Sequence, residues 1–510
     1  MSKIMVVPKR SMRGCLTCKR RKKKCDEQKP SCRRCIQGDF HCFGYDSSEI
    51  SCAKGPSGNA NTGLPHWSSY ASVAPDLKES FDLTPLENLI PVPEHTIGTG
   101  SSSKLPTPVQ RVKPSAPTIP NCLILDPLVL ENATSLIMSQ YLGLTRELLF
   151  KPPLTSLERG LLWRIEYSDF TRWSMYLGAR VLHDISSGKN GQKYTGWIFR
   201  FCQRILESST STETEEAIEG QLGGLHDLAY LGFMVSGIAF GYSLFQRCTH
   251  TFLRLAALSP DLWSDNSTIS ISKALRRRYE ASKFVAHDTI IACILGIPPL
   301  LHYDTTSPWG DEKSNRVLEL VYGVPCETLY HFAKINAWRA SRLMSEVAQS
   351  RSDWFDIEIS LTNGSPAIDH TDEPVKDIAR FAVQEIWRQS ALIYFYMGVR
   401  GVNSADPRVE AAVQQVVQLG STIEPGSALE LHTLISCVIA GAAARQEKHR
   451  ASIRSKVASR SFRREITLVL RVSEFTAVLD HLWHGAGIEG KPTTWEDYVQ
   501  SRSSVLPIAC

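Results

Sequence analysis

Six cysteines close together near the start of the chain constrain its fold more than any other feature. They follow the spacing C-x2-C-x6-C twice, with a period of 17 residues, and lie at Cys15, Cys18, Cys25, Cys32, Cys35 and Cys42. The stretch before them, MSKIMVVPKRSMRG, has charges and no long hydrophobic core, which argues against secretion. In a reducing compartment, clustered cysteines are more often metal ligands than disulfides. The cluster therefore predicts a small domain that is held together by metal ions.

The number of sulfurs indicates how many ions this domain binds. A structural zinc ion takes four soft ligands in a tetrahedron. Six thiolates can bind one zinc ion and leave two sulfurs spare, or they can bind two zinc ions if two sulfurs each bridge both metals. The symmetric repeat favours two ions, while a single zinc ion, a three-disulfide knot and a ligand role for His41 remain as alternatives.

The first long gap of the repeat is made entirely of cations, KRRKKK, whereas the second reads IQGDFH. Residues 1–45 contain 13 Lys/Arg and 3 Asp/Glu, a local charge of +10, and the rest of the chain carries −5. This asymmetry predicts a polyanionic partner for the head alone. We expect residues 19–24 to form a recognition helix, because Lys and Arg donate hydrogen bonds to guanine O6 and N7 and to phosphates. A nuclear-import signal is a competing use of the same run.

The cysteine spacing and the basic gap together resemble the fungal Zn2Cys6 binuclear-cluster transcription factors, over residues 15–42. The resemblance implies that all six cysteines hold two Zn2+ ions per chain, with Cys15 and Cys32 bridging the metals. It also implies that Lys29-Pro30 form the turn between the two halves of the head. The target that it implies is double-stranded DNA with a CGG-type half-site.

The same resemblance assigns DNA contacts to five cations of the basic gap, namely Lys19, Arg20, Arg21, Lys22 and Lys24. Arg21 and Lys22 are expected to read base edges, and the other three to bind the phosphate backbone. Lys23 departs from the family pattern, in which this position is often apolar, so no role is assigned to it. Because the two Zn2+ and six thiolates sum to −2, the head keeps about +8, and its DNA affinity should fall steeply with salt.

The composition after the head divides the chain into three predicted domains: residues 1–46 for the zinc head, 47–120 for a linker and 121–510 for a helical body. Residues 46–120 hold 11 of the 27 prolines together with Ser/Gly/Thr-rich runs, and this composition predicts a disordered linker. One island, Asp76–Ile90, alternates acids with Leu, Phe and Ile. It is either an activation segment that folds on a partner or a weakly sticky part of the linker.

The body has the hydrophobic periodicity of helices. In VKDIARFAVQEIWRQSALIYFYMGV, one apolar stripe is predicted at Ile378, Phe381, Ala382 and Ile386. Further helical runs are expected at 157–186, 192–208, 218–257, 271–296, 326–349, 407–419, 427–449 and 465–485, while strand-like alternation is scarce. The predicted fold class is therefore mostly α, with a small metal-anchored Zn2Cys6 domain, a disordered linker and a large all-α domain.

The segment EASKFVAHDTIIACILGIPPLLHYDT resembles the helical regulatory region that follows the cluster in many of these fungal factors. That resemblance implies regulation rather than catalysis. The best catalytic candidates are His287-Asp288 and His302 with Asp304. Adjacent residues on a helix point in different directions, so His287 and Asp288 are not expected to form a dyad. No P-loop, HExxH or GxSxG motif occurs, and we predict that the chain is not an enzyme.

Two other stretches of the body have more than one interpretation. The uncharged run Ala229–Phe245 is at the short edge for a membrane span, and we interpret it as a buried helix. The basic tract between Ala444 and Arg464, including residues 445–464, has eight Lys/Arg and one Glu. It is expected to be a solvated helix or loop beside the core, with DNA contact or nuclear import as alternatives. Leu431–Ala444, just before it, is predicted to be a buried helix.

These observations predict a nuclear, sequence-specific DNA-binding transcription factor whose helical body regulates RNA polymerase II transcription. Its expected partners are double-stranded DNA and either the transcription machinery or coregulators, and no membrane. No sustained a/d heptads follow the head, so the sequence does not support dimerisation through a coiled coil. Whether the chain forms a homodimer in another way is left open by the sequence. The alternative is a helical interaction protein whose zinc head is a structural or protein-binding module.

Overall fold

The computed structural model divides the chain into two units, Met1–Thr118 and Ile119–Cys510, and each is described here by itself. In the first unit, the head, it describes Cys15, Cys18 and residues 23–29 and 32–37. In the second, the helical unit, it describes residues 127–148, 150, 154–208, 214–265, 267–307, 309–310, 317–343, 352–364, 374–458, 466–467 and 470–508. The predicted linker and the segment Asp76–Ile90 lie outside the described residues. The predicted domain boundaries stay predictions.

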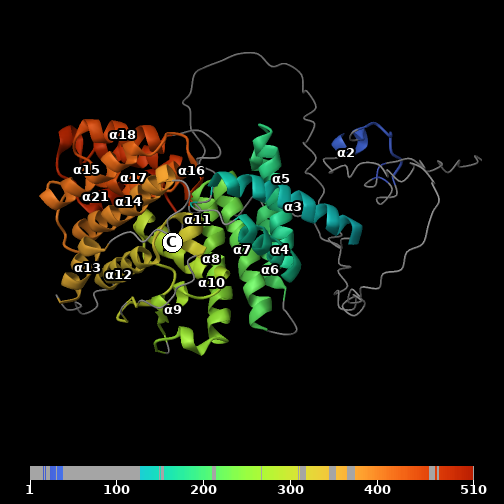
Figure 1. The fold of residues 1–510 in the computed structure, drawn as a ribbon, viewed down its shortest axis with the longest axis horizontal. Helices are drawn as coiled ribbons and strands as arrows, with labels where there is room; N and C mark the ends of the chain where they lie inside the picture. The colour runs from blue at the N-terminus through green and yellow to red at the C-terminus, as the bar shows by residue number, and fades with distance from the viewer. Residues whose placement is uncertain are drawn as a thin grey trace, which may run out of the picture. The chain divides into compact units, whose positions relative to one another are not determined.

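The second unit is a layered assembly of helices, which confirms the predicted fold class (Figure 1). Its first half contains α3 Pro127–Leu148, α4 Leu154–Tyr167, α5 Asp169–Ser186, α6 Thr195–Glu207, α7 Glu215–Ser236, α8 Ile238–Ala257, α9 Ile271–Leu275 and α10 Tyr279–Leu295. Its second half contains α11 Val317–Tyr322, α12 Cys326–Leu343, α13 Ser352–Asn363, α14 Pro374–Gly398, α15 Pro407–Thr422, α16 Ala428–Leu431, α17 Leu434–Ala443, α18 Glu447–Val457, α20 Phe475–His484 and α21 Trp495–Val505.

Strands are few and short in the described part of the chain. β1 Ile269–Ser270 pairs in parallel with β2 Tyr303–Asp304, and β3 Ile466–Thr467 pairs antiparallel with β4 Leu470–Arg471. The predicted helical run 465–485 is therefore only partly confirmed, because its first residues form β3 and β4 and the α-helix α20 begins at Phe475. Asp304, which the sequence offered as a catalytic candidate, is the last residue of β2.

The uncharged run Ala229–Phe245 lies largely inside the core and is divided between α7 and α8. Thr214 caps α7 by accepting from the backbone N–H of Ala217, and two glutamates occupy the first turn, where they complement the helix dipole. The helix ends at Gly237, whose φ of 87° is favourable only for glycine. This sharp turn lets α8 pack back along α7, so the predicted single helix 218–257 is two helices.

The interpretation of Ala229–Phe245 as a buried helical segment rather than a membrane span is supported by this packing. Phe233 and Phe245 have no exposed surface, and Gly241 lies so close to Phe233 that a Cβ would meet its ring at 2.2 Å. Within the described ranges, no helix is long and apolar enough to cross a bilayer.

α14 is the longest helix of the second half and is central to its core. Trp387 is fully buried and packs edge-on against Phe332 of α12 at 6.0 Å between ring centroids. Of the predicted stripe, Ala382 and Ile386 are buried, but Ile378 is 67 % exposed. The stripe was wrong at Ile378 because the face of α14 that packs inward in its first turns presents Asp377 and Arg380, which pair at 2.9 Å.

The prediction of a buried helix at Leu431–Ala444 is confirmed for α17, in which every residue is buried, whereas Leu431 ends α16 and the predicted helical run 427–449 is divided among α16, α17 and α18. α21 begins with a capping box: the Thr494 hydroxyl accepts from the Asp497 N–H, and the Asp497 carboxylate accepts from the Thr494 N–H. The first residue of this helix, Trp495, is fully buried. The predicted helix 157–186 is interrupted at Ser168, which separates α4 from α5.

Candidate metal centre and nucleic-acid interface

Four cysteine sulfurs of the head meet at one point. The Cys15 sulfur lies 3.5 Å from that of Cys32 and 3.7 Å from that of Cys35, and the Cys18 sulfur lies 3.6 Å from Cys32 and 3.8 Å from Cys35. All four side chains are buried and their sulfurs lie within 4.8 Å of one another. The two halves of the sequence repeat therefore bring their first two cysteines to the same place.

The backbone around these sulfurs repeats the internal symmetry of the sequence. The N–H of Cys18 donates to the sulfur of Cys15 at 3.3 Å, and the N–H of Cys35 donates to the sulfur of Cys32 at 3.2 Å. In the first half, the Cys25 sulfur also accepts from the backbone N–H of Cys15, at 3.3 Å. Donors aimed at sulfur stabilise thiolates, which are the form that binds metal.

The donor set fits zinc better than disulfides. The five described cysteines of the head form no disulfide bond with one another, and the 3.5 Å between the sulfurs of Cys15 and Cys32 is far beyond the length of such a bond. Burial raises the pKa of the Cys18 thiol, so a buried sulfur cluster needs a cation to be held as thiolates. A second potential group, formed by Cys25, Asp26 and Cys32, shares Cys32 with the first. Cys42 lies outside the described residues, as does His41.

The basic gap is described only at its last two residues, Lys23 and Lys24, and neither of them lies in a helix, so the predicted recognition helix 19–24 does not reach the end of the gap. The N–H of Lys23 donates to the carbonyl of Cys18 at 3.0 Å, and the side chains of Lys23 and Lys24 are exposed. The predicted contact residues Lys19, Arg20, Arg21 and Lys22 lie outside the described residues, and so does Pro30. Of the five predicted DNA-binding cations, the structure thus places Lys24 alone, at the surface.

Sequence reasoning missed two residues that connect the halves of the head. The Asp26 carboxylate accepts from the backbone N–H groups of Arg33 and Arg34 at the start of α2 (Arg33–Gln37), at 3.0 and 2.7 Å. The Arg34 guanidinium donates to the carbonyl of Lys24 at 3.2 Å. The signal in the sequence was an aspartate in the short loop between two cysteine turns, a residue type that commonly caps helices.

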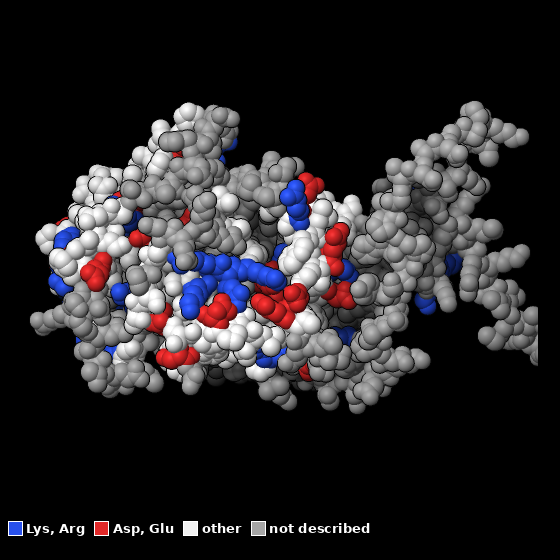
Figure 2. All heavy atoms as spheres, turned by 60° about the horizontal axis from the view of Figure 1, so that its bottom comes forward, with Lys and Arg blue, Asp and Glu red and all other residues white. Residues whose placement is uncertain are grey.

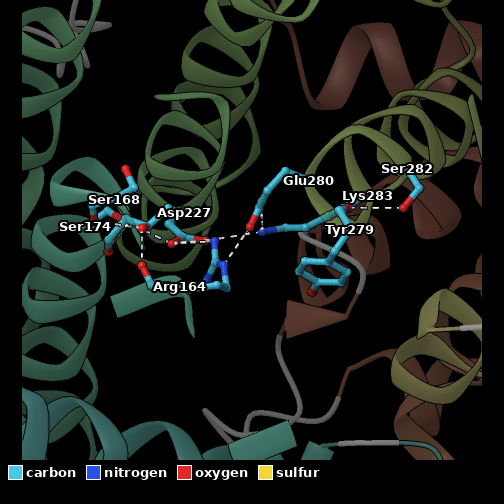
Figure 3. A network of polar contacts seen from close by, with 9 residues as sticks. Arg164, Ser168, Ser174, Asp227, Tyr279, Glu280, Ser282 and Lys283 are labelled. Carbon is cyan, nitrogen blue, oxygen red and sulfur yellow. Dashed lines mark hydrogen bonds and ion pairs between the residues drawn. The ribbon is translucent and has the colours of Figure 1, made fainter. Parts of the chain in front are cut away.

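The helical unit contains a network of charges in its interior that links α4, α7 and α10 (Figure 3). Arg164 lies between two carboxylates, at 3.1 Å from Asp227 and 2.6 Å from Glu280, and Lys283 lies 3.3 Å from Asp227. The hydroxyl of Ser174 also donates to Asp227, at 3.1 Å. The charges of its two cations and two anions cancel. Such a neutral network is typical of ion pairs that hold helices together, and we interpret it as structural.

Electrostatics keep Asp227 ionised in this network. Burial opposes the charged form, but Arg164 and Lys283 outweigh it and hold the pKa of Asp227 below its ordinary value. A buried charge with its partners removed is strongly destabilising, so these residues are expected to matter for the stability of the helical unit.

His287 and Asp288, one of the two pairs of catalytic candidates in the body, have separate structural partners. The His287 Nδ1 is 2.7 Å from the Nε2 of His226, while the carboxylate of Asp288 accepts from the Tyr303 hydroxyl at 2.8 Å and from the Leu300 N–H at 2.9 Å. Burial lowers the pKa of His287 and raises that of Asp288 to about 6. As expected of neighbours on a helix, the two side chains diverge and form no dyad.

Basic side chains in the described part of the tract 445–464 form hydrogen bonds and ion pairs within the helical unit. Arg450 is buried and donates to the carbonyls of Ala444 and Gly487 at 2.9 and 2.7 Å. Arg454 pairs with Asp480 at 2.7 Å, and Lys456 pairs with Glu430 at 2.8 Å. These contacts favour the interpretation of a helix beside the core, since three of its cations already have protein partners.

Lys and Arg side chains gather on one face of the molecule, directly beside Asp and Glu side chains (Figure 2). The same intermixing appears in the ion pairs at the start of α10. Arg277 lies 2.9 Å from Asp261, and Arg278 lies 3.2 Å from Glu219. Basic side chains that are paired in this way contribute little to attraction of a polyanion.

Two family comparisons cover most of the described chain. Residues 13–49 match the fungal Zn(2)-Cys(6) binuclear cluster domain, and residues 230–508 match the fungal specific transcription factor domain. The second match covers more than half of the chain. No solved structure matches.

Curated relatives match over short segments. The chain is 54% identical over 39 residues to the transcription factor lfc1 of Flammulina velutipes, which is 8% of this chain and 14% of that protein. It is 43% identical over 44 residues to the white-opaque regulator 2 of Candida albicans, 9% and 10% of the two chains. It is 58% identical over 34 residues to the transcription activator AMTR1 of Alternaria alternata, 7% and 4%. The matches thus span a small share of each relative.

Proposed function

This chain belongs to the fungal specific transcription factor family and carries a Zn2Cys6 domain that binds two zinc ions, and we propose that it reads CGG-type half-sites in nuclear DNA. As a DNA-binding transcription regulator, it would act on genes transcribed by RNA polymerase II. The observation that carries the proposal is the convergence of four buried cysteine sulfurs, two from before the basic gap (Cys15 and Cys18) and two from the second half of the repeat (Cys32 and Cys35). We assign no catalytic role to the helical unit.

We propose that all six cysteines are the zinc ligands and that Cys15 and Cys32 bridge the two ions. Cys32 belongs to both groups of potential ligands, which supports a bridging role. Cys15 is its equivalent in the sequence repeat and lies 3.5 Å from it. Zinc would supply the cross-links that hold the head together, because structural zinc contributes folding free energy directly.

In this proposal, five of the six cations of the basic gap contact DNA, and they do so in two ways. Arg21 and Lys22 donate to guanine O6 and N7, while Lys19, Arg20 and Lys24 bind phosphates. The exposed position of Lys24 supports its assignment. The domain limits would be 1–46 for the zinc head, 47–120 for the linker and 121–510 for the regulatory body, which would bind coregulators or the transcription machinery.

A selection of random duplexes with the full-length protein, at two salt concentrations, tests the proposal. We expect a GC-rich motif and an affinity that falls steeply with salt. Arg21→Ala should cost about 1–3 kcal/mol on the selected site and relax its base preference, whereas Lys19→Ala, the matched control, should weaken all sequences alike and reduce the salt slope by about 1.

Zinc stoichiometry by native mass spectrometry distinguishes the alternative function. If Arg21→Ala with Lys22→Ala keeps two zinc ions and full DNA affinity but loses binding to a protein partner, the head is a protein-binding module. The symmetry of the selected site would also report whether the chain binds as a homodimer.

A further inference from the structure

The Asp26 carboxylate accepts hydrogen bonds from backbone N–H groups on both sides of the loop between the two cysteine turns. It directly follows Cys25, and one carboxylate oxygen accepts from the backbone N–H groups of Gln28 and Arg33 at 3.2 and 3.0 Å. The other oxygen accepts from the N–H of Arg34 at 2.7 Å. Asp26 belongs to the first half of the repeat and Arg33 and Arg34 to the second. The carboxylate therefore connects the two halves independently of the metal.

A second contact runs in the opposite direction. The guanidinium of Arg34 donates to the carbonyl of Lys24, the last residue of the basic gap, at 3.2 Å. Glu27 lies between Lys24 and Arg34 in the sequence. Its φ of 60° is in the left-handed region that non-glycine residues rarely adopt. This turn brings the Gln28 N–H back to Asp26. Asp26 and Arg34 thus form a reciprocal clamp between the end of the basic gap and the start of α2.

The clamp restrains the backbone after Cys25, whose direction the metal–sulfur bonds alone do not determine. Zinc fixes the positions of the sulfurs, but each cysteine can still rotate about its side-chain torsions, so the backbone leaving Cys25 is not fixed by the metal alone. α2 has only five residues, so the N–H groups that Asp26 accepts are a large part of its backbone donors. Charge-assisted hydrogen bonds at a helix start are among the stronger ones that a carboxylate forms.

We propose that Asp26 and Arg34 are positioning residues for DNA binding: their clamp fixes the orientation of the basic gap relative to the second half of the head. The inference rests on the proposed DNA-binding role of that gap. Neither residue contacts DNA in this role. The clamp instead holds the cations of the basic gap in a single orientation, in which they can contact the DNA duplex together.

Whether Asp26→Asn raises or lowers the DNA affinity distinguishes a positioning role of Asp26 from a purely electrostatic one. Asp26→Asn removes a negative charge from a domain that binds a polyanion, so electrostatics alone predicts tighter binding. The clamp predicts weaker binding, because the amide nitrogen placed at one oxygen position faces the Arg34 N–H and cannot accept from it. Glu27→Gln is the matched control, since it removes the same charge one residue away. Among the described residues, the Glu27 carboxylate has no hydrogen bond or ion pair.

The test measures the affinity of full-length, zinc-loaded protein for the duplex selected with the wild type, together with zinc content. We expect Asp26→Asn to bind about tenfold more weakly with two zinc ions retained, the size that follows from losing one charge-assisted hydrogen bond. Glu27→Gln should bind as well as the wild type or slightly better. Asp26→Glu, which keeps the charge but displaces the oxygens, should also bind more weakly.

Two results would overturn the clamp. One is equal or tighter binding by Asp26→Asn at full zinc content. The other is a loss of zinc by Asp26→Asn and Asp26→Glu in proportion to the loss of affinity, which would make Asp26 a residue of folding and not of positioning. A wild-type chain that selects no duplex at all would instead refute the proposed function, and with it the clamp.

Discussion

The head and the helical unit bury different kinds of side chain. In the described part of the head, the buried side chains are five cysteines, whereas the helical unit buries a continuous core of aliphatic and aromatic residues that includes Trp387, Trp495 and Tyr498. Among its described residues the head therefore has buried sulfurs and no apolar core, while the helical unit has an extensive apolar core. A few sulfurs at fixed spacing specify the head, and many interchangeable apolar residues specify the helical unit.

Removal of zinc should have the largest effect and tests this difference most directly. We expect a strong chelator to unfold the head and abolish DNA binding completely, because zinc supplies much of the folding free energy of so small a domain. The helical signal in far-ultraviolet circular dichroism should persist, since it comes mainly from α3 to α21. Restoring zinc should restore DNA binding. Loss of the helical signal together with the metal would show that the two units do not fold independently.

A change inside the helical unit should have a smaller effect that leaves the head intact. Asp227→Ala removes the carboxylate that contacts both Arg164 and Lys283, and leaves these buried cations without one of their counter-charges. We expect a loss of about 3–5 kcal/mol in the free energy of unfolding of the helical unit. Urea unfolding followed by circular dichroism would measure it, with zinc content unchanged.

Asp480→Ala is the control for this prediction. It breaks the pair with Arg454, whose side chain is 53% exposed, and should cost less than about 1 kcal/mol. Equal losses in the two variants would mean that the buried network is no more important than an exposed pair, and that apolar packing alone stabilises the helical unit.

The same difference determines what the sequence could predict. The cysteine spacing predicted the convergence of sulfurs, because each ligand lies a few residues from the next. Helical periodicity predicted most helices but missed the breaks at Ser168 and Gly237, although Ser168 followed by Asp169 is a helix-start pattern. The network around Arg164 was beyond prediction, since its partners Asp227 and Glu280 lie 63 and 116 residues away in the chain. Long-range pairs of this kind follow from how helices pack, which periodicity does not specify.

The pH dependence of the helical unit should show the smallest effect, and it depends on Asp288. Burial raises the pKa of this carboxyl to about 6, although hydrogen bonds from Leu300 and Tyr303 act in the opposite direction. An unfolded aspartate has a pKa of about 3.9, so between these values the folded state binds a proton that the unfolded state lacks. Stability from Asp288 is thus present below pH 4 and is lost as the pH rises to about 6. The loss is at most about 3 kcal/mol.

The variant Asp288→Asn isolates this contribution, because asparagine has a similar shape and does not titrate. We expect the free energy of unfolding of the wild type, relative to the variant, to fall as the pH rises from 4 to 7, when both are measured by urea unfolding. Other carboxyls cancel in this difference. A constant difference across the range would mean that Asp288 titrates alike in the folded and unfolded states, and that the interior of the helical unit tolerates its charge. In that case the contrast with the head would be weaker, since hydrogen bonds from Leu300 and Tyr303 would then be enough to stabilise a buried anion in the helical unit without a cation.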